Sequence, residues 1–368
     1  MTSAKICYVV NSVSETSVPA TLATALTDYE NLHVDILAWF EADSFEGDDR
    51  VGVVNLGAPQ SMTGINQETY KKARSVLQEY DLIQANLNHA GSIAKLIGHR
   101  LSIPLVSREG NTRDGFSRKG RIANGLTNVF ADRIVPNSQA VYNSFTRWER
   151  LLIDDERVRI IPNGVDLDRI DRAADSDYSL RDQFDISSDA VTVGTAAMIT
   201  EQKAHDVLVR AVDYANTCLG SSRIHLVITG DGPLRSDIET LAASLGIDDK
   251  IHITGLVDRK RVYEILSEID IYAMPSRWEG FSNAAVEALG AGKPCVFSDI
   301  DPFVIPYEDV ALFHTLDDSR ELADRLDKLT TDGDLRRQYG QQGRKLVEEQ
   351  YTLKQVAAAY AELYAELL

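Results

Sequence analysis

The sequence predicts an α/β protein made of two successive domains, each with a parallel sheet covered by helices on both faces. The chain has 368 residues, whereas a single hydrophobic core usually stops growing at about 250 to 300 residues. Short β-patterned segments alternate with longer helix-patterned ones, which is typical of parallel sheets. This alternation runs through the first half of the chain, pauses and then restarts. Two doubly wound units therefore explain the pattern better than one.

The first half holds six short segments that we expect to form strands. They span residues 5–10, 33–39, 51–56, 81–85, 103–107 and 133–136. The first of them begins with a single lysine and runs into polar Asn11 and Ser12. It is too short for the apolar core of a signal peptide, so we interpret it as the first strand of the fold.

A break in the pattern predicts the boundary between the two domains. Pro162 and the Asn163-Gly164 pair interrupt regular structure, and the next strongly apolar segment lies well downstream. We therefore assign residues 1–165 to the first domain and residues 166–351 to the second.

The second half repeats the alternation of strands and helices. Its expected strands span residues 191–196, 224–229, 251–254, 269–273 and 294–297, and its expected helices lie near residues 203–219, 233–245, 259–267 and 283–291. The final segment, residues 352–368, carries apolar residues at helical spacing. One face of this last helix must therefore be buried.

The composition restricts location and partners. The formal net charge is -18, and binding to nucleic acid requires a basic face, so no nucleic-acid partner is expected. No apolar stretch approaches the roughly 20 residues that cross a bilayer, which predicts a cytoplasmic protein with at most peripheral membrane contact. The three cysteines, Cys7, Cys218 and Cys295, are far apart and suggest neither a disulfide framework nor a zinc site.

The strongest candidate site is the loop between the expected strand 269–273 and a helix that begins near Ser282. Ligands of open α/β sheets bind beyond the carboxyl ends of the strands. Gly280 allows the backbone to approach a ligand, and the start of the following helix offers unpaired N–H groups to a diphosphate. Glu279 and Glu287 would lie on opposite sides of this anion site. The alternative is an ordinary glycine turn before a helix.

The segment Pro275-Ser276-x-x-Glu279-Gly280-Phe281, followed by Glu287, resembles the E-x7-E signature of the retaining, GT-B fold glycosyltransferases of family 4 (glycosyl transferases group 1). The similarity continues through most of the second half and is looser in the first half. The other similar segments are residues 161–166, 193–195, 202–206, 230–233 and Gly255, together with 88–91 and 135–138. The resemblance implies two Rossmann-like domains that face each other across a cleft, with the last helix packed back on the first domain.

The resemblance also implies a nucleotide-diphosphate sugar as the donor, bound by the second domain. Glu279 would grip hydroxyls of the donor sugar, and Glu287 would hydrogen-bond the nucleotide ribose. Lys203 would lie against the diphosphate and stabilise the charge that builds on the leaving group. The further donor-site residues that the resemblance implies are Gly280, Phe281, Ser282, Gly230, Gly232 and Gly255. For Gly230 and Gly232, the packing of a strand-to-helix turn is an equally good explanation.

The chemistry that the resemblance implies is transfer with retention by front-face displacement. The leaving diphosphate oxygen accepts the proton of the acceptor hydroxyl, so no dedicated base, cofactor or metal is expected. Two aspartate pairs, Asp166-x-Asp168 and Asp299-x-Asp301, superficially suggest a metal-binding motif. We interpret them instead as residues of loops and helix starts.

Two positions depart from the family pattern. Met198 stands where these enzymes usually carry a diphosphate-binding arginine, and Gly110 stands where many carry a histidine near the donor sugar. Arg277 is a candidate substitute for the missing arginine. These departures keep open an alternative function, that of a non-catalytic nucleotide-sugar-binding partner of another glycosyltransferase. A Rossmann oxidoreductase is disfavoured because no G-x-G-x-x-G follows the first strand.

The acceptor side is expected on the first domain, where the candidate contacts are His89, Arg108 and Arg113. Arg108 and Arg113 begin a basic segment that continues to Arg121 in an otherwise acidic chain. Such a loop could meet a lipid phosphate or an anionic membrane surface, or it could be a solvated loop whose arginines pair with nearby acids. The expected acceptor is a glycan or a lipid-phosphate-linked molecule.

Overall fold

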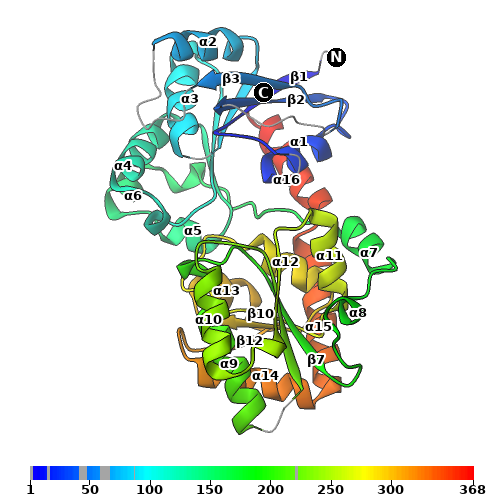
Figure 1. Cartoon of the computed structure of the whole chain (residues 1–368). Helices are drawn as coiled ribbons and strands as arrows, with labels where there is room; N and C mark the ends of the chain where they lie inside the picture. The colour runs from blue at the N-terminus through cyan, green and yellow to red at the C-terminus, as the bar shows by residue number, and fades with distance from the viewer. Residues whose placement is uncertain (1–2, 15–16, 41–47, 59–66, 87, 220–222) are drawn as a thin grey trace. The chain divides into compact units, whose positions relative to one another are not determined.

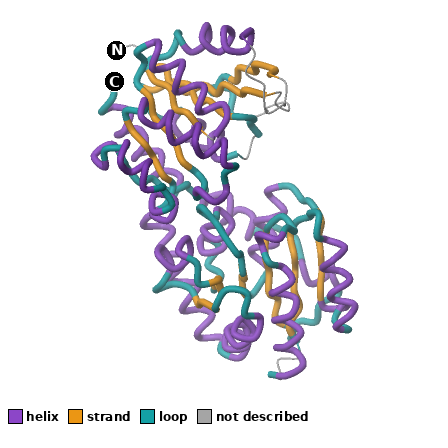
Figure 2. Tube along the Cα trace, turned by 90° about the vertical axis from the view of Figure 1, so that its left-hand side faces the viewer, coloured by secondary structure: helices purple, strands orange, loops and turns teal. Residues whose placement is uncertain are grey.

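The computed structural model describes residues 3–14, 17–40, 48–58, 67–86, 88–219 and 223–368. The chain forms two compact units, Met1–Gly164 together with Leu353–Leu368, and Val165–Thr352. Each unit contains a parallel sheet with helices on both of its faces (Figure 1 and Figure 2). The predicted α/β class with two doubly wound sheets is confirmed.

The first unit is built on a six-stranded parallel sheet with the strand order β3-β2-β1-β4-β5-β6. Its strands are β1 (Ala4–Val10), β2 (Leu32–Phe40), β3 (Val53–Ala58), β4 (Leu82–Asn86), β5 (Leu105–Glu109) and β6 (Arg133–Pro136). Its helices are α1 (Val18–Leu26), α2 (Gln67–Leu77), α3 (Asn88–Leu101), α4 (Arg118–Thr127), α5 (Gln139–Asn143), α6 (Arg147–Leu152) and α16 (Leu353–Ala365). The central strands β1 and β4 are almost wholly buried, because helices cover both faces of a parallel sheet.

The C-terminal helix α16 packs against α1 on one face of this sheet and buries Tyr360 and Tyr364. The hydroxyls of Tyr8 and Tyr364 lie 2.6 Å apart, and Tyr364 donates to Oε1 of Gln84 at 2.6 Å. These contacts satisfy polar atoms that would otherwise be buried without a partner, which costs about 1 to 3 kcal/mol for each group. An apolar face and a buried polar contact together hold α16 on the first unit.

The second unit has the same topology as the first. Its strands, in the sheet order β12-β11-β10-β7-β8-β9, are β7 (Val191–Ala196), β8 (Ile224–Thr229), β9 (Ile251–Gly255), β10 (Ile271–Met274), β11 (Cys295–Ser298) and β12 (Leu312–His314). Its helices are α7 (Leu167–Ala174), α8 (Leu180–Phe184), α9 (His205–Cys218), α10 (Arg235–Leu245), α11 (Arg259–Glu268), α12 (Asn283–Gly290), α13 (Asp301–Tyr307), α14 (Ser319–Thr331) and α15 (Gly333–Gln350). Read from β9, this is the 3-2-1-4-5-6 strand order of the dinucleotide-binding fold.

The topology determines where the second sheet can bind a ligand. Strands β7 and β10 are hydrogen-bonded neighbours, although two other strands separate them in the sequence. The chain leaves β7 for α9 on one face of the sheet and leaves β10 for α12 on the other. Because the two connections diverge, a crevice is expected beyond the carboxyl ends of these strands, at Ala196 and Met274.

No helix among the described residues is both long enough and apolar enough to cross a membrane.

Candidate functional site

Two loops at the carboxyl end of the second sheet bring Lys203 and Glu279 together. Lys203 ends a short 3-10 turn (Glu201–Lys203) after β7, and Glu279 lies in the loop between β10 and α12. The residues are 76 positions apart, yet Nζ of Lys203 forms an ion pair with Oε1 of Glu279. Their side chains are only 19% and 6% exposed. Water therefore screens this pair less than it screens a surface pair.

Gln202 fastens the same two loops to each other. Its Nε2 donates to the carbonyl oxygen of Trp278 at 2.8 Å and lies 3.4 Å from Oε2 of Glu279. Its own carbonyl oxygen accepts from the N–H of Arg277 at 2.7 Å. The position of the Glu279 carboxylate is therefore determined by the loop after β7 as well as by its own loop.

Arg277 does not replace the arginine that is missing at Met198, and this corrects the prediction made for it. Its Nε donates to Oδ1 of Asp317 at 2.8 Å, and its Nη1 donates to the carbonyl oxygen of Glu201 at 2.7 Å. Its Nη2 lies 3.1 Å from Oδ2 of Asp206. All three nitrogens of the guanidinium are therefore engaged by the protein. Met198 itself is 60% exposed and carries no charge.

The start of α12 is capped by Ser282, whose Oγ accepts from the N–H of Ala285 at 3.3 Å. The same hydroxyl donates to Sδ of Met274 at 3.2 Å. Phe281 packs against the hydrophobic core, with its ring 6.2 Å from that of Tyr351. These side chains hold the loop that carries Gly280 and the first helical turn in place. Any contribution of this loop to an anion site would come from its backbone N–H groups.

Glu287 lies in the second turn of α12 and is 4% exposed. Its Oε1 forms an ion pair with Nη2 of Arg259 and lies 3.4 Å from the hydroxyl of Tyr263. Its Oε2 is buried and has no hydrogen-bond partner among the described residues. Arg259 and Tyr263 belong to α11 and are not among the predicted site residues. The available signal was the run of cations from Arg259 to Arg261 at a helix start, where the helix dipole disfavours positive charge.

Backbone conformation and close backbone contacts explain why glycine occupies three positions on neighbouring turns. Gly230 and Gly255 have φ values of 146° and 73°, which favour glycine. A Cβ on Gly230 would lie 2.1 Å from the carbonyl oxygen of Ala197, and one on Gly232 would lie 2.4 Å from that of Ile199. These glycines let the turn after β8 pack against the loop after β7. Packing therefore accounts for Gly230 and Gly232 without a ligand.

In the first unit, His89 lies in the first turn of α3, just beyond the end of β4. Its ring stacks on that of Phe40 with the centroids 5.7 Å apart. Burial lowers the pKa of His89, so its ring is neutral at pH 7. Its Nε2 is buried and has no hydrogen-bond partner within the described part of the chain. The ring therefore offers one unused nitrogen.

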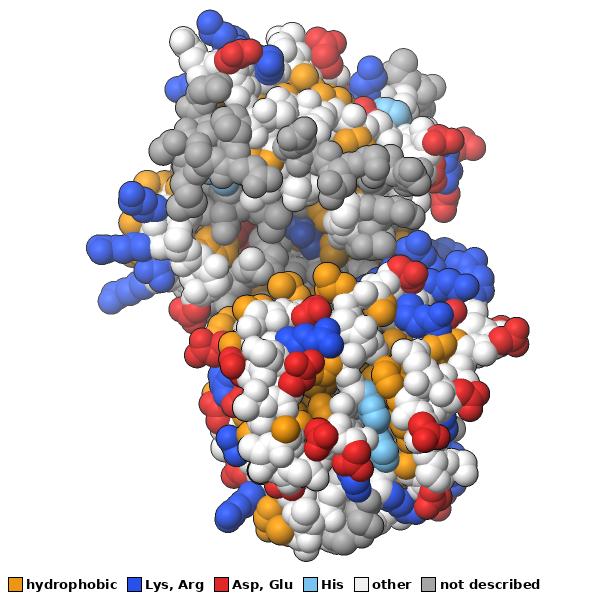
Figure 3. Space-filling model, in the orientation of Figure 1, with side chains coloured by type: hydrophobic (Ala, Val, Ile, Leu, Met, Phe, Trp, Pro, Cys, Tyr) orange, Lys and Arg blue, Asp and Glu red, His pale blue; other side chains and the backbone are white. Residues whose placement is uncertain are grey.

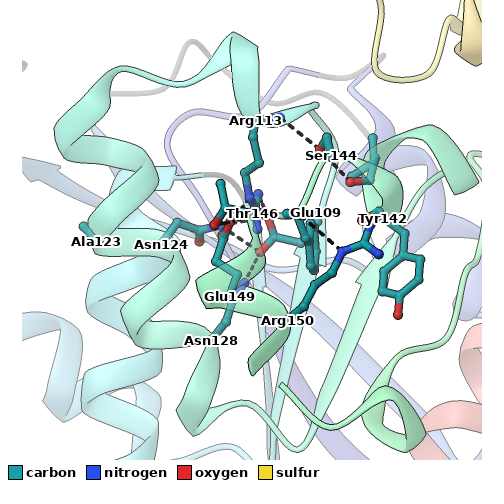
Figure 4. Close-up of polar contacts among 12 residues, drawn as sticks. Glu109, Arg113, Ala123, Asn124, Asn128, Tyr142, Ser144, Thr146, Glu149 and Arg150 are labelled. Carbon is teal, nitrogen blue, oxygen red and sulfur yellow. Dashed lines mark hydrogen bonds and ion pairs between the residues drawn. The ribbon is translucent and has the colours of Figure 1, made fainter. Parts of the chain in front are cut away.

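Arg113 is not placed to contact an acceptor, which corrects the prediction made for it. Its side chain is 2% exposed and lies between two carboxylates (Figure 4). Its Nη1 is 2.8 Å from Oε2 of Glu109, and its Nε is 2.8 Å from Oε1 of Glu149. The guanidinium also lies 4.1 Å from the centroid of the Phe145 ring. Arg113 is a structural cation inside a buried polar cluster of the first unit.

The predicted basic loop is divided between the interior and a helix. Arg108 is 8% exposed, and its Nη2 donates to Oδ1 of Asn163. Arg118, Lys119 and Arg121 lie in the first turns of α4 rather than in a loop. Arg108 and Arg113 therefore do not form one basic surface with the three later cations, which corrects that part of the prediction.

The buried polar cluster around Arg113 contains a second cation, Lys95, at 1% exposure. Its Nζ donates to Oδ1 of Asn124 at 2.7 Å and to Oδ1 of Asn128 at 2.5 Å. Both asparagines donate in turn to the carboxylate of Glu109. Burial lowers the pKa of Lys95 to about 8, against the opposing attraction of Glu109.

Lys95 should make the free energy of unfolding depend on pH in the alkaline range. Its pKa is about 8 in the folded protein and 10.5 when a lysine is exposed. Between these values the unfolded chain binds more protons, so the unfolding free energy rises with pH. Relative to Lys95→Met, the wild type should gain about 3 kcal/mol between about pH 7 and about pH 10.5. Urea unfolding of both proteins across this range measures the difference, and a constant difference would contradict the argument.

The two aspartate pairs lie at helix starts and loop ends, as interpreted from the sequence. Oδ1 of Asp166 caps α7 by accepting from the N–H of Arg169 at 3.1 Å, and Oδ1 of Asp299 accepts from the N–H of Leu316 at 2.9 Å. Within the ranges that the structure describes, no group of three or more His, Cys, Asp or Glu side chains could hold a metal ion.

Two family models match the chain. Residues 17–169 match Glycosyltransferase Family 4, and residues 178–346 match Glycosyl transferases group 1. The D-inositol 3-phosphate glycosyltransferase of Nocardia farcinica is 27% identical over 323 residues, which cover 81% of this chain and 68% of that protein. The N-acetylgalactosamine-N,N'-diacetylbacillosaminyl-diphospho-undecaprenol 4-alpha-N-acetylgalactosaminyltransferase of Campylobacter jejuni is 27% identical over 220 residues, which cover 58% of this chain and 55% of that protein. For four of the glycosyltransferases that it matches, this one included, the chain spans only 55% to 63% of their length.

Solved structures resemble the whole chain. Anabaena Alr3699/HepE, solved in complex with UDP, has a TM-score of 0.81 at 18% identity, with 99% of this chain and 100% of that chain covered. WaaG, a glycosyltransferase involved in lipopolysaccharide biosynthesis, has a TM-score of 0.72 at 16% identity, with 97% and 99% covered. These likenesses confirm the two-domain GT-B fold.

Proposed function

Because this chain belongs to the glycosyl transferases group 1, we propose that it transfers a sugar from a nucleotide-diphosphate donor to a glycan, lipid-linked or other hydroxyl acceptor, with retention of the anomeric configuration. The observation that carries the proposal is the Lys203–Glu279 ion pair at the carboxyl end of the second sheet, with Glu287 buried in the helix that follows. The residues of the E-x7-E motif and the ion pair both lie at the carboxyl ends of the strands, where open α/β sheets bind their ligands.

The proposed roles follow from the charges. Lys203 is a poorly solvated cation at the crevice, and the diphosphate is the donor's strongest anion, so Lys203 would stabilise the charge that develops on the leaving group. Glu279 would then be released from Lys203 to accept hydrogen bonds from sugar hydroxyls. The backbone N–H groups at the start of α12 would bind diphosphate oxygens. Glu287 would accept a hydrogen bond from the ribose.

In the proposed step, the bond between the anomeric carbon and the diphosphate oxygen breaks while a bond to the acceptor oxygen forms on the same face of the sugar. The acceptor proton passes to the leaving diphosphate oxygen, so no separate base is required. We propose that Lys203 and the helix start provide the stabilisation without a metal ion or other cofactor. Activity is then expected to persist in the presence of EDTA.

For the donor we propose a nucleoside-diphosphate sugar such as a UDP-sugar. HepE was solved with UDP and with UDP-glucose, and it has the same fold as this chain. Because Met198 carries no charge, it cannot make the charge-assisted hydrogen bond to the diphosphate that an arginine would make at this position. Such a hydrogen bond is worth about 1.5 to 3 kcal/mol. We therefore expect donor binding to be about one to two orders of magnitude weaker than in relatives that carry an arginine there.

Calorimetric titration with UDP-, GDP- and dTDP-sugars tests the donor site, with Glu287→Ala titrated alongside. We expect saturable binding of one nucleotide family by the wild type and its loss in a folded variant. If no donor binds the folded wild type, the proposed function is wrong. If a donor binds but no nucleotide is released in the presence of candidate acceptors, the second candidate applies, a non-catalytic partner of another glycosyltransferase. Met198 and Gly110 are the observations that favour this second candidate.

For the acceptor we propose a lipid-linked molecule reached at the cytoplasmic face of a membrane, because the relative from Campylobacter jejuni is named for a diphospho-undecaprenol substrate. The surface of α4 and α6 is suited to such contact. Lys and Arg side chains project there beside hydrophobic ones (Figure 3). The exposed apolar residues are Ile122, Leu126, Leu151 and Leu152. Gly125 packs α4 directly on Trp148 of α6, since a Cβ would lie 2.3 Å from that ring.

The cations of this α4–α6 surface are available to lipid phosphates. No ion pair links Arg118, Lys119, Arg121 or Arg147 to another residue in the described part of the chain. Leu151 is 78% exposed, and removing it from water would add apolar burial to the electrostatic attraction.

Sedimentation with vesicles tests the α4–α6 surface. The wild type is expected to bind phosphatidylglycerol vesicles more strongly than phosphatidylcholine vesicles. The double variant Arg118→Gln, Lys119→Gln should weaken this binding by about 10-fold or more, because each cation near an anionic surface is worth about 1 kcal/mol. The matched control Lys71→Gln, Lys72→Gln removes two exposed charges of α2. Equal losses in both variants would contradict a specific membrane surface.

A further inference from the structure

The first turn of α11 contains three successive cations, Arg259, Lys260 and Arg261. Positive charge at a helix start is unfavourable with respect to the helix dipole. Arg259 is oriented inward: Nη2 forms the ion pair with Glu287, and Nε donates to the hydroxyl of Tyr263 at 3.0 Å. Its guanidinium lies 5.1 Å from the centroid of the Tyr263 ring. Arg259, Tyr263 and Glu287 therefore form a connected group, which we call the Glu287 clamp.

Within the Glu287 clamp, the two carboxylate oxygens of Glu287 have different surroundings. Oε1 takes both protein contacts, the ion pair with Arg259 and the hydroxyl of Tyr263 at 3.4 Å. Oε2 is buried and has no hydrogen-bond partner among the residues that the structure describes. A buried acceptor without a donor is costly. The arrangement therefore fixes the carboxylate through one oxygen and leaves the other for a donor that the described protein groups do not provide.

We propose that Arg259 and Tyr263 are positioning residues that hold Glu287 so that Oε2 receives a hydroxyl of the donor nucleotide's ribose. This inference rests on the proposed function and extends it to residues outside the E-x7-E motif. The chemistry of the free group selects the ligand: a carboxylate oxygen accepts from a hydroxyl and repels a phosphate. Arg259 acts through Glu287, because its Nε and Nη2 are already engaged within the clamp.

The sharpest test is the affinity lost when a ribose hydroxyl is deleted. Calorimetry would compare UDP with 2′-deoxy-UDP and 3′-deoxy-UDP, in the wild type and in Arg259→Gln. In the wild type, deletion of the hydroxyl that binds Glu287 should weaken binding about 10- to 100-fold, as for a hydrogen bond to a charged group. In Arg259→Gln this penalty should fall below about 3-fold. The ratio of UDP to UMP affinity should stay unchanged, because the diphosphate is bound elsewhere.

Three further variants make the test specific. Arg261→Gln is the matched control, because its guanidinium lies 4.0 Å from the Tyr178 ring and pairs with Glu264 rather than with Glu287; it should keep the full deoxy penalty. Tyr263→Phe should reduce the penalty partly, since Arg259 still holds Oε1. Arg259→Lys should restore part of the penalty, because the charge is retained.

The outcomes separate the clamp from the proposed function. If the wild type binds no nucleotide, the proposed function fails and the clamp with it. If the wild type shows the deoxy penalty and folded Arg259→Gln keeps it in full, only the clamp is wrong. If Arg259→Gln changes the ratio of UDP to UMP affinity instead of the deoxy penalty, Arg259 contacts phosphate and the proposed positioning role is overturned.

Discussion

Replacing Lys203 with methionine is expected to lower kcat/KM for nucleotide release from the donor by about 10²- to 10³-fold. This is the usual effect of removing one preorganised group from the place where charge develops in the transition state. Lys203 is only 19% exposed, so bulk water does not readily replace its charge. Steady-state kinetics of nucleotide release, with and without acceptor, measure the loss. Lys203→Arg should retain part of the activity, because its charge remains while its planar shape differs.

The partner of Lys203 requires its own control. Lys203→Met leaves the buried Glu279 without its cation, which destabilises folded proteins. The double variant Lys203→Met, Glu279→Gln removes that charge, and thermal unfolding of both variants shows whether the fold survives. Lys345→Met alters a 74% exposed lysine of the same unit and should leave the rate unchanged. A folded Lys203→Met protein with wild-type kcat/KM would exclude the proposed role of Lys203.

Much of the fold could be predicted because its strands are buried apolar runs separated by amphipathic helices. The bounds expected for β6, β7 and β8 are those observed, at Arg133–Pro136, Val191–Ala196 and Ile224–Thr229. Strand β12 was not predicted, since its three residues, Leu312–His314, are too few to form a visible pattern. Helix α13 was also missed, because Pro306 inside it argues against a helix.

The candidate site was predictable only where a motif or a strand end marks it. Glu279 and Glu287 lie within one continuous segment, and Lys203 joins them because the strand order places β7 beside β10. The contact of Arg259 with Glu287 joins α11 to α12 across 28 positions of sequence and depends on their tertiary placement, which local sequence does not specify. Arg113 was misassigned for a related reason. Its partner Glu149 is 36 positions downstream, so a local charge pattern does not reveal that the arginine is buried.

Replacing Arg113 with methionine is expected to reduce the free energy of unfolding by about 3 to 5 kcal/mol. The variant leaves Glu109 and Glu149 buried, at 3% and 0% exposure, with the buried Lys95 still close enough to attract both carboxylates. That loss is a large share of the roughly 5 to 15 kcal/mol by which native proteins are usually stable. Urea unfolding measures it. Arg118→Met, which changes an exposed arginine of α4, should stay within about 0.5 kcal/mol of the wild type.

The pH dependence distinguishes the loss of this ion pair from a general loss of packing. Burial opposes ionisation of Glu109, but Arg113 and Lys95 outweigh it and lower its pKa to about 2, below the 4.5 of an exposed glutamate. Ionised Glu109 therefore stabilises the folded state above about pH 4.5, and this contribution is lost as the pH falls toward about 2. Without Arg113 the contribution is smaller, so the unfolding free energies of wild type and variant should converge in acid. A variant as stable as the wild type, but with weakened acceptor binding, would instead return Arg113 to the acceptor site.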